Sequence, residues 1–312
     1  MSSEQVFSYL GPAGTFTEQA LDMVPSARGA RRFPVANVAE ALRTVVAGEA
    51  DAAMIAIENS VEGGVTAAQD ALARTPGLRI LSEHLVHVNF SLVAAPGTSL
   101  DDISLISAHP VAYAQCLNWL GAHLPAHSHL PAGSNVAAAQ TLAETPAHAA
   151  LSLPAVAEAA GLEILARDIG DNADAVTRFV LVGRPGPLPE PTGADKTSVI
   201  VDLPADRPGT LLDMLEQFAT RGVNLSLIQS RPIGDKLGRY RFVIDCEGHA
   251  SEERVADALL GLKRFSPRLV FLGSYARADE ERTAIGTRYS DDSFVEARDW
   301  LRGIVSGEPE AQ

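Results

Sequence analysis

Hydrophobic residues in the first 180 positions alternate between short continuous runs and segments with helical spacing. The run at 6–11 predicts a buried strand, and the stretch that opens at Thr15 predicts a helix. The same order returns after Asn37, where Gly48 is expected to end a helix ahead of a strand at 51–57. Strands separated by helices of this length are typical of an α/β fold with largely parallel sheets.

Capping patterns mark two of these helix starts. Glu18 follows Thr15, and Glu40 follows Asn37, at the three-residue spacing of a capping box, so both helices are expected to begin there. The remaining elements predicted for this region are apolar runs at 79–94 and 103–108, helices near 110–122, 135–144 and 154–160, and strands near 163–169 and 177–183.

The composition changes at 183–195, where four prolines and three glycines predict a boundary between domains. The order after it is strand, helix, strand, strand, helix, strand, which is the ferredoxin-like βαββαβ pattern. These elements are predicted at 196–203, 208–221, 223–230, 237–245, 251–263 and 267–274. A charged tail follows 276, and its amphipathic stretch 293–305 is expected to form a helix.

Length and composition fit a globular protein of about two domains, with 312 residues and 46% hydrophobic residues. A formal net charge of −14 argues against nucleic-acid binding through the phosphate backbone. Cys116 and Cys246 are too few and too far apart for a disulfide framework or a cysteine zinc site. The N-terminus lacks the pattern of a signal peptide, and no apolar run is long enough for a membrane span. We therefore expect a cytoplasmic protein that binds neither nucleic acid nor membrane.

The segment GPAGTFTEQA places a glycine-rich turn between a strand and a helix. Backbone N–H groups near Gly14 and Thr15 are candidates to bind a carboxylate or phosphate there. An ordinary strand–helix turn explains the same residues equally well, because the segment has neither a dinucleotide fingerprint nor a Walker lysine.

The segment IENSVEGGV places Glu58, Asn59 and Ser60 directly after a buried strand, followed by Gly63 and Gly64. Open α/β sheets bind ligands at the carboxyl ends of their strands, so these side chains are candidates to hold a substrate. The alternative is that Asn59 and Ser60 only cap the following turn.

A polar turn at 170–176 leads into a strand that begins with Thr177, Arg178 and Phe179. Arginine can bind a carboxylate through two hydrogen bonds, and a threonine hydroxyl can donate to a departing oxygen. The alternative is a plain strand start with a solvated arginine.

Histidines gather at His123, His127 and His129, but without the spacing of a known metal site. We predict an exposed loop and no metal site. His109, near Gln115, is a candidate for the wall of a cleft, or alternatively a cap of the next helix.

Several of these segments together resemble the prephenate dehydratase family, in that family's order, over residues 5 to about 275. The matching segments are GPAGTF, IENSVEGGV, HPVAYAQC at 109–116, GSNVAAA at 133–139 and TRF at 177–179. The later segments RPGTLLDML at 207–215 and NLSLIQSRP at 224–232 resemble those of an ACT domain.

The resemblance implies a two-lobed catalytic region, similar to a type II periplasmic binding protein, followed by a ferredoxin-like ACT domain. The implied domains are 1–184 for catalysis and 196–275 for regulation, with a tail at 276–312. The implied catalytic residues are Thr177 and Arg178. The implied substrate-binding residues are Gly14, Thr15, Glu58, Asn59, Ser60, Gln115, Ser134 and Phe179.

The implied reaction is the decarboxylative dehydration of prephenate to phenylpyruvate, which needs no cofactor because the ring gains aromaticity. Phenylalanine is the implied effector, bound in a homodimer or homotetramer near Gly209, Leu211, Asn224, Leu225 and Ser230. Two other functions stay open, namely an arogenate dehydratase and a non-catalytic amino-acid sensor.

Three positions depart from the family pattern. Gln229 stands where the family usually has glutamate before SRP, which bears on how the effector is bound. Ala175 stands where asparagine is common, with Asp171 and Asn172 slightly upstream, and Ser134–Asn135 replaces a serine–threonine pair. None of these changes removes the Thr177–Arg178 pair.

Overall fold

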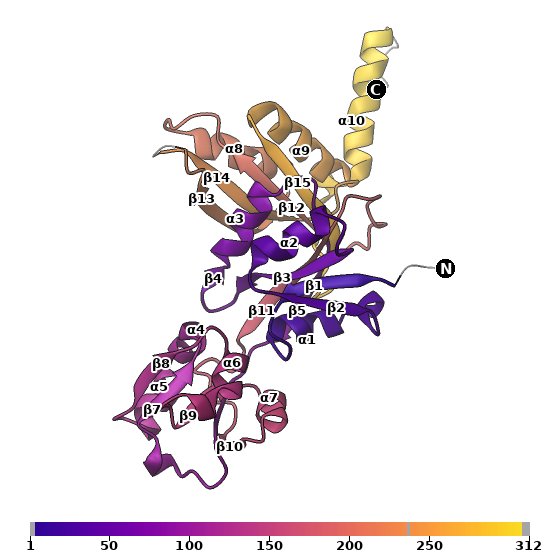
Figure 1. Cartoon of the computed structure of the whole chain (residues 1–312). Coiled ribbons are helices and arrows are strands. Elements are labelled where there is room, and N and C mark those ends of the chain that lie inside the picture. The colour runs from indigo at the N-terminus through magenta and orange to yellow at the C-terminus, as the bar shows by residue number, and fades with distance from the viewer. Residues whose placement is uncertain (1–3, 236–237, 308–312) are drawn as a thin grey trace. The chain divides into compact units, whose positions relative to one another are not determined.

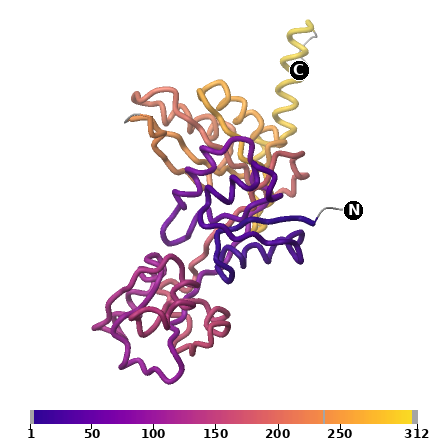
Figure 2. The backbone as a smooth tube through the Cα atoms, in the orientation of Figure 1, coloured from indigo at the N-terminus to yellow at the C-terminus, as the bar shows by residue number. Residues whose placement is uncertain are grey.

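A computed structural model describes residues 4–235 and 238–307 of the chain (Figure 1). Its backbone forms two compact units, which Figure 2 traces from the indigo N-terminus to the yellow C-terminus. The first unit comprises the residues up to Ala68 together with His84–Phe179. The second comprises Gln69–Glu83 and the chain from Val180 onward.

The first sheet has the strand order β2-β1-β3-β11-β5, and β4 pairs with β3. β1 is parallel to β2 and β3, as the alternation of strands and helices predicts. β11 lies between β3 and β5 although it follows them far along the chain, so it brings its residues beside those of β3. The strands are β1 (Val6–Leu10), β2 (Arg31–Val35), β3 (Ala52–Asn59), β4 (Gly63–Gly64), β5 (Arg79–His87) and β11 (Val176–Gly183), with helices α1 (Phe16–Asp22), α2 (Val38–Val46) and α3 (Thr66–Arg74).

The second sheet, with the order β10-β6-β9-β7-β8, is mixed rather than largely parallel. β7 is parallel to β8 and β9, whereas β6 is antiparallel to β9 and β10. Buried aliphatic residues of the sheet and its helices form the core of this lobe. The elements are β6 (Ser91–Ala94), β7 (Leu105–Ala108), α4 (Pro110–Ala114), α5 (Leu117–His123), β8 (Ser128–Pro131), α6 (Asn135–Gln140), β9 (Ala149–Ser152), α7 (Pro154–Ala159) and β10 (Glu163–Ala166).

The helix predicted over 110–122 is two helices, α4 and α5. Cys116 between them has a non-helical backbone, with φ −121° and ψ 8°. The carboxylate of Asp171 accepts hydrogen bonds from the N–H groups of Asn118 and Trp119, at 3.0 and 3.3 Å. The first N–H groups of a helix have no partner within the helix, and Asp171 satisfies two of them here. This explains why a second helix begins at this point.

The prediction of an exposed histidine loop is wrong for His127 and His129, which are half-buried. His129 lies in β8 and its ring stacks on Tyr113, with centroids 4.0 Å apart. The Tyr113 hydroxyl lies 3.0 Å from His127 Nε2. Within residues 4–235 and 238–307, no group of histidine, cysteine or acidic side chains has the arrangement of a metal site.

The capping box expected at Thr15 is also wrong. Glu18 Oε2 accepts from the N–H of Gly14 at 2.6 Å, and the Thr15 hydroxyl donates to Leu10 O instead of capping the helix. Asn37 does cap α2, because its side chain accepts from Glu40 N at 2.9 Å. The Glu40 carboxylate accepts from Ala36 N, whereas a capping box would have it accept from Asn37 N. The second half of this capping box is therefore shifted by one residue.

The C-terminal part of the chain has the predicted βαββαβ order and the sheet order β13-β14-β12-β15. β12 pairs antiparallel with β14 and β15, and β13 pairs antiparallel with β14. Two helices pack on this sheet (Figure 1), and their apolar residues share one buried core with it. The elements are β12 (Asp195–Asp202), α8 (Thr210–Ala219), β13 (Leu225–Pro232), β14 (Tyr240–Glu247), α9 (Glu253–Phe265) and β15 (Leu269–Ala276).

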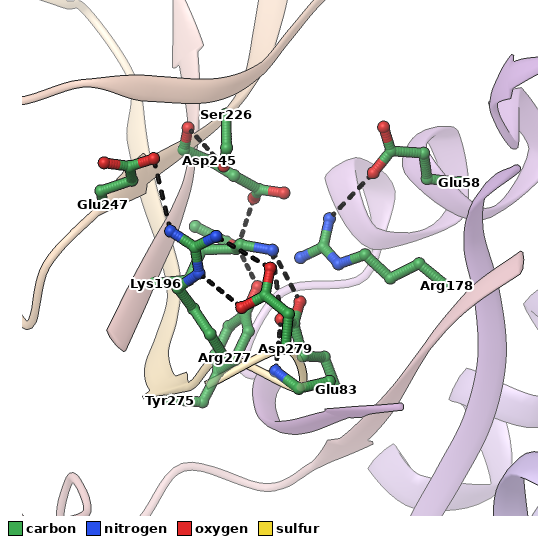
Figure 3. Close-up of polar contacts among 12 residues, drawn as sticks. Glu58, Glu83, Arg178, Lys196, Ser226, Asp245, Glu247, Tyr275, Arg277 and Asp279 are labelled. Carbon is green, nitrogen blue, oxygen red and sulfur yellow. Dashed lines mark hydrogen bonds and ion pairs between the residues drawn. The ribbon is translucent and has the colours of Figure 1, made fainter. Parts of the chain in front are cut away.

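A buried ion pair joins β5 to the C-terminal sheet inside the second unit (Figure 3). Lys196 Nζ donates to both carboxylate oxygens of Glu83, at 3.1 and 2.9 Å. Both side chains are at least nine-tenths buried. A second contact with β5 is made by Gly273, which has no room for a side chain because an added Cβ would lie 2.5 Å from Ile80 O. Segment 69–83 is therefore part of the packed structure of the second unit.

The tail contains the predicted helix, α10 (Asp291–Ser306), but no residue of this helix is buried. Ser290 caps its start by accepting from Ser293 N. Trp300, Leu301 and Val305 are exposed large apolar residues on it. No helix among the described residues combines the length and apolar character needed to cross a membrane.

Candidate functional site

The first unit contains a cavity of about 390 Å³, a volume within the usual range for small-molecule sites. Both lobes of this unit contribute to its wall. The lining residues are Leu10, Gly11, Thr15, Phe16, Thr17, Ala36, Ala56, Asn59, Val88, Phe90, His109, Val111, Ala112, Gln115, Gly133, Ser134, Asn135, Thr177 and Phe179.

The carboxyl end of β3 and the start of β11 supply Asn59, Thr177 and Phe179 to this wall. Thr177 and Phe179 line the cavity because alternate residues of a strand face the same side. Arg178 does not line it. Its Nη1 lies 3.4 Å from Glu58 Oε2 (Figure 3), and its side chain is only 6% exposed. Glu58 is likewise outside the lining, so this ion pair supports the strand ends from behind.

Asn59 and Thr177 form a hydrogen bond across 118 residues of sequence. Asn59 Nδ2 donates to Thr177 Oγ1 at 2.8 Å. Asn59 Oδ1 accepts from Val61 N at 2.9 Å and Glu62 N at 3.1 Å, so the amide can be oriented in only one way. Since the Thr177 oxygen accepts from Asn59, its own proton is directed elsewhere and can be donated to a ligand in the cavity.

Ser60 ties the same two strand ends together without lining the cavity. Its N–H donates to Val176 O, and its hydroxyl accepts from Val176 N, both at 2.9 Å. This reciprocal pair fixes the backbone one residue before Thr177. The structure thus gives Ser60 a bracing position and leaves the wall of the cavity to Asn59 and Thr177.

The glycine turn before α1 brings Thr15 to the wall but not Gly14. Gly14 has a φ of +88°, and an added Cβ would lie 3.2 Å from Val156 Cγ2. Its N–H already donates to Glu18, as described above, so it is not a donor for a ligand. Phe16 lines the cavity beside Phe90, with the rings edge to face at 5.8 Å.

His109 lies at the start of α4 and both caps this helix and lines the cavity. Its Nδ1 accepts from Val111 N at 3.3 Å, which places the imidazole proton on Nε2. Burial lowers the pKa of His109 below its ordinary value, so the ring is neutral at neutral pH. Asn135 Oδ1 accepts from His109 N at 3.0 Å and joins the starts of α4 and α6.

Ser134 and Gln115 complete the polar wall on the second lobe. The Ser134 hydroxyl accepts from Ala137 N at 3.0 Å as the cap of α6, which leaves its proton available. Gln115 is buried, and its Nε2 lies 3.3 Å from Glu62 Oε1. Gln115 therefore connects the second lobe to the turn that holds Asn59.

The lining combines neutral polar groups with an aromatic and aliphatic wall, and none of the described residues that form it is a lysine, arginine, aspartate or glutamate. Six of the predicted site residues share it: Thr15, Asn59, Gln115, Ser134, Thr177 and Phe179. Four others, Gly14, Glu58, Ser60 and Arg178, lie behind it. The prediction did not include Phe16, Phe90 or Asn135, although Phe16 and Asn135 belong to recognised segments and Phe90 lies within the predicted apolar run at 79–94.

The predicted effector residues all lie in the second unit, around α8 and β13. Gly209 precedes α8 with a φ of 87°, and Leu211 on this helix is 41% exposed. Asn224 Nδ2 donates to Glu247 Oε1 at 2.9 Å. Leu225 opens β13 and is half-buried, and Ser230 lies exposed on the same strand.

Comparison with known proteins agrees with the segments found in the sequence. The family model described as prephenate dehydratase matches residues 7–187, and the ACT domain model matches residues 197–264. A prephenate dehydratase of Amycolatopsis methanolica is 42% identical over 302 residues, which cover 96% of this chain and 98% of the relative.

Solved structures also resemble most of the chain. The prephenate dehydratase of Arthrobacter aurescens in complex with L-Phe is 55% identical with a TM-score of 0.91, covering 96% of this chain and 99% of that one. GqqA, described as a novel type of quorum quenching acylase, is 30% identical with a TM-score of 0.76, covering 89% and 100%. Because a protein described as an acylase shares this fold, the site must carry the argument about chemistry.

Proposed function

Because the chain belongs to the prephenate dehydratase family, we propose that it is a carbon–oxygen lyase that converts prephenate to phenylpyruvate, carbon dioxide and water. We further propose that residues 1–184 carry out this reaction and that 196–275 are a regulatory ACT domain, followed by a tail at 276–312. The observation that carries the catalytic proposal is the bond from Asn59 to the Thr177 hydroxyl in the wall of the cavity.

In this reaction the bond to the ring carboxylate breaks, and its electron pair becomes part of the aromatic ring. The ring hydroxyl leaves with its bonding electrons and takes up one proton to become water. The enzyme must therefore hold a dianion in one orientation and offer a hydrogen-bond donor to the departing oxygen.

Thr177 is the proposed donor to the departing hydroxyl. A threonine hydroxyl is a weak acid, so orientation must supply most of its effect. Asn59 supports that orientation in two ways, because it fixes the hydroxyl oxygen and polarises the O–H bond by donating to it. Solvent returns the proton after the product leaves.

The carboxylates and the oxo group of the substrate are proposed to bind the neutral donors of the wall. Gln115 and Ser134 supply side-chain hydrogens, and His109 supplies its Nε2 proton. Thr15 lines the same wall, but its hydroxyl already donates to Leu10 O. Phe179, with the neighbouring aromatic rings, is proposed to contact the six-membered ring of the substrate.

The residues behind the wall are proposed to position the reacting groups. Arg178 and Glu58 hold the ends of β11 and β3 through their ion pair, and Ser60 does so through Val176. Arg178 is thereby assigned to support of Thr177, and Gly14 to the shape of the turn before Thr15.

Phenylalanine is the proposed allosteric effector, because the C-terminal part matches the ACT domain and the Arthrobacter aurescens relative was solved with L-Phe. We propose that it binds near Gly209, Leu211, Asn224, Leu225 and Ser230 in a homo-oligomer. Effector control then requires that phenylalanine bind two arrangements of the protein with different affinities.

The test is the formation of phenylpyruvate from prephenate by the full chain, in parallel with arogenate. Turnover of prephenate should exceed that of arogenate, and Thr177→Ala should lower it by about 10²–10⁴ while leaving the unfolding temperature nearly unchanged. Normal turnover by Thr177→Ala would exclude Thr177 from the mechanism. Absence of turnover on both substrates would leave the non-catalytic sensor as the function.

A further inference from the structure

Helix α3 is anchored to strand β13 by two side-chain contacts within the second unit. Gln69 Nε2 donates to Gln229 Oε1 at 2.5 Å. The next residue of the helix is Asp70, and its carboxylate accepts two hydrogen bonds from Arg231, at 3.0 and 2.8 Å. Consecutive residues of α3 thus bind alternate residues of β13, which are the two that flank Ser230.

These contacts are better formed than an ordinary surface pair. Arg231 binds Asp70 through two parallel bonds, the geometry that gives an ion pair directional specificity. The hydrogen bonds from Arg231 hold the pKa of Asp70 below its ordinary value, so the pair is charged across the neutral range. Gln69 is completely buried, so its amide cannot exchange Gln229 for water.

The N-terminal end of α3 follows closely on the Asn59 turn. β4 ends at Gly64, Val65 N donates to Ile57 O at 2.8 Å, and α3 starts at Thr66. The boundary between the two units runs through this helix, after Ala68. α3 therefore contacts β13 through residues in its middle, and its first residue follows closely on the turn that orients Thr177.

We infer that α3 is the element that couples effector binding to catalysis, with Gln69 and Asp70 as positioning residues that transmit a shift of β13 to the Asn59–Thr177 pair. This inference rests on the proposed regulation by phenylalanine and adds to it the route of coupling. A helix is suited to this role because a displacement of its middle moves its N-terminal end with it. Gln69 Oε1 is a buried acceptor for which the described residues provide no partner. A second arrangement of the Gln69 contact that gave this oxygen a donor would therefore be favoured.

The experiment compares the full-length protein with Asp70→Asn and with the double variant Gln69→Leu/Asp70→Asn. Neither residue lines the cavity or belongs to the proposed effector site, so turnover without phenylalanine should stay within about threefold of the unmodified protein. Phenylalanine affinity, measured by calorimetry without substrate, should also stay within that range. The maximal effect of phenylalanine on kcat/KM should fall below twofold in the double variant.

The matched control is Arg43→Gln, which breaks the exposed ion pair between Arg43 and Glu49 on and beside α2. This change removes an ion pair of similar length that has no contact with β13, and it should leave the phenylalanine effect intact. A full phenylalanine effect in the double variant would overturn the inference.

Amide hydrogen exchange separates failure of the coupling route from failure of the proposed function. Phenylalanine should change exchange in β13 and in 58–66 of the unmodified protein, but only in β13 of the double variant. Exchange changes confined to β13 in the unmodified protein would overturn the coupling role. Absence of prephenate turnover would instead refute the proposed reaction, while exchange at 58–66 would still report whether α3 connects the two places.

Discussion

Replacement of Asn59 by alanine should reduce turnover only as long as Thr177 keeps its hydroxyl. Asn59→Ala removes the donor that fixes Thr177 Oγ1, and Thr177→Val removes the hydroxyl itself without changing the shape of the side chain. If both residues act through one proton, their effects cannot be independent. The two changes combined should then be no worse than Thr177→Val alone.

The size of each effect follows from the contacts. Thr177→Val should lower kcat by about 10²–10⁴, the usual contribution of a positioned proton donor. Asn59→Ala removes one neutral hydrogen bond to the reacting group, about 0.5–1.5 kcal/mol, which corresponds to about a 2- to 13-fold loss of kcat. The bonds to Val61 and Glu62 are also lost, but both N–H groups belong to exposed residues and water can replace Asn59 there.

The assay is steady-state formation of phenylpyruvate at saturating prephenate for the two single variants and the double variant, with unfolding temperatures as the control for stability. We expect the double variant to match Thr177→Val within about threefold. If the kcat losses of the two single variants multiply in the double variant, Asn59 acts on the substrate independently of Thr177. The reasoning from its bond to Thr177 would then be wrong.

Lys196→Met should lower the free energy of unfolding in urea by about 3–5 kcal/mol, because it leaves Glu83 buried without its cation. The double variant Lys196→Met/Glu83→Gln should recover part of this loss. Gly273→Ala should destabilise the protein by more than about 2 kcal/mol through a clash with the β5 backbone, whereas Gly186→Ala in the open linker should change stability by less than about 0.5 kcal/mol. Burial raises the pKa of the Cys116 thiol to about 12, so an alkylating reagent at pH 8 should leave Cys116 unmodified in the native protein and modify it in urea. Mass spectrometry measures the modification, and rapid alkylation of the native protein would contradict this prediction.

Hydrophobic periodicity predicted most of the central strands but missed the short central strand β9 and one edge strand in each of the first two sheets. β2, with the sequence RRFPV, and β8, with SHLP, each have a single neighbour in the sheet. Edge strands commonly carry charged residues and proline, which removes the apolar signal on which the prediction depends. The break between α4 and α5 was missed for another reason, since it depends on Asp171, a residue far away in the sequence.

The candidate site was predictable where local sequence decides the position of a side chain. The strand period alone places Thr177 and Phe179 on one face and Arg178 on the other. The partner of each polar group was not predictable in this way. The bond from Asn59 to Thr177 and the contact of Gln229 with Gln69 both depend on how distant segments of the chain pack together.

The position of β11 between β3 and β5 has a consequence for how the chain is made. A ribosome produces β1, β2 and β3 early, but the strand that fills the middle of their sheet emerges only after the whole second lobe. At about 5–20 residues per second, the 118 residues from Asn59 to Thr177 take roughly 6–24 s to synthesise. During that interval the open edge of β3 must avoid premature pairing, and the second lobe, which is continuous in sequence, can fold first. The threonine hydroxyl thus arrives with the last strand of the sheet, so that the chain cannot be active before its N-terminal lobe is closed.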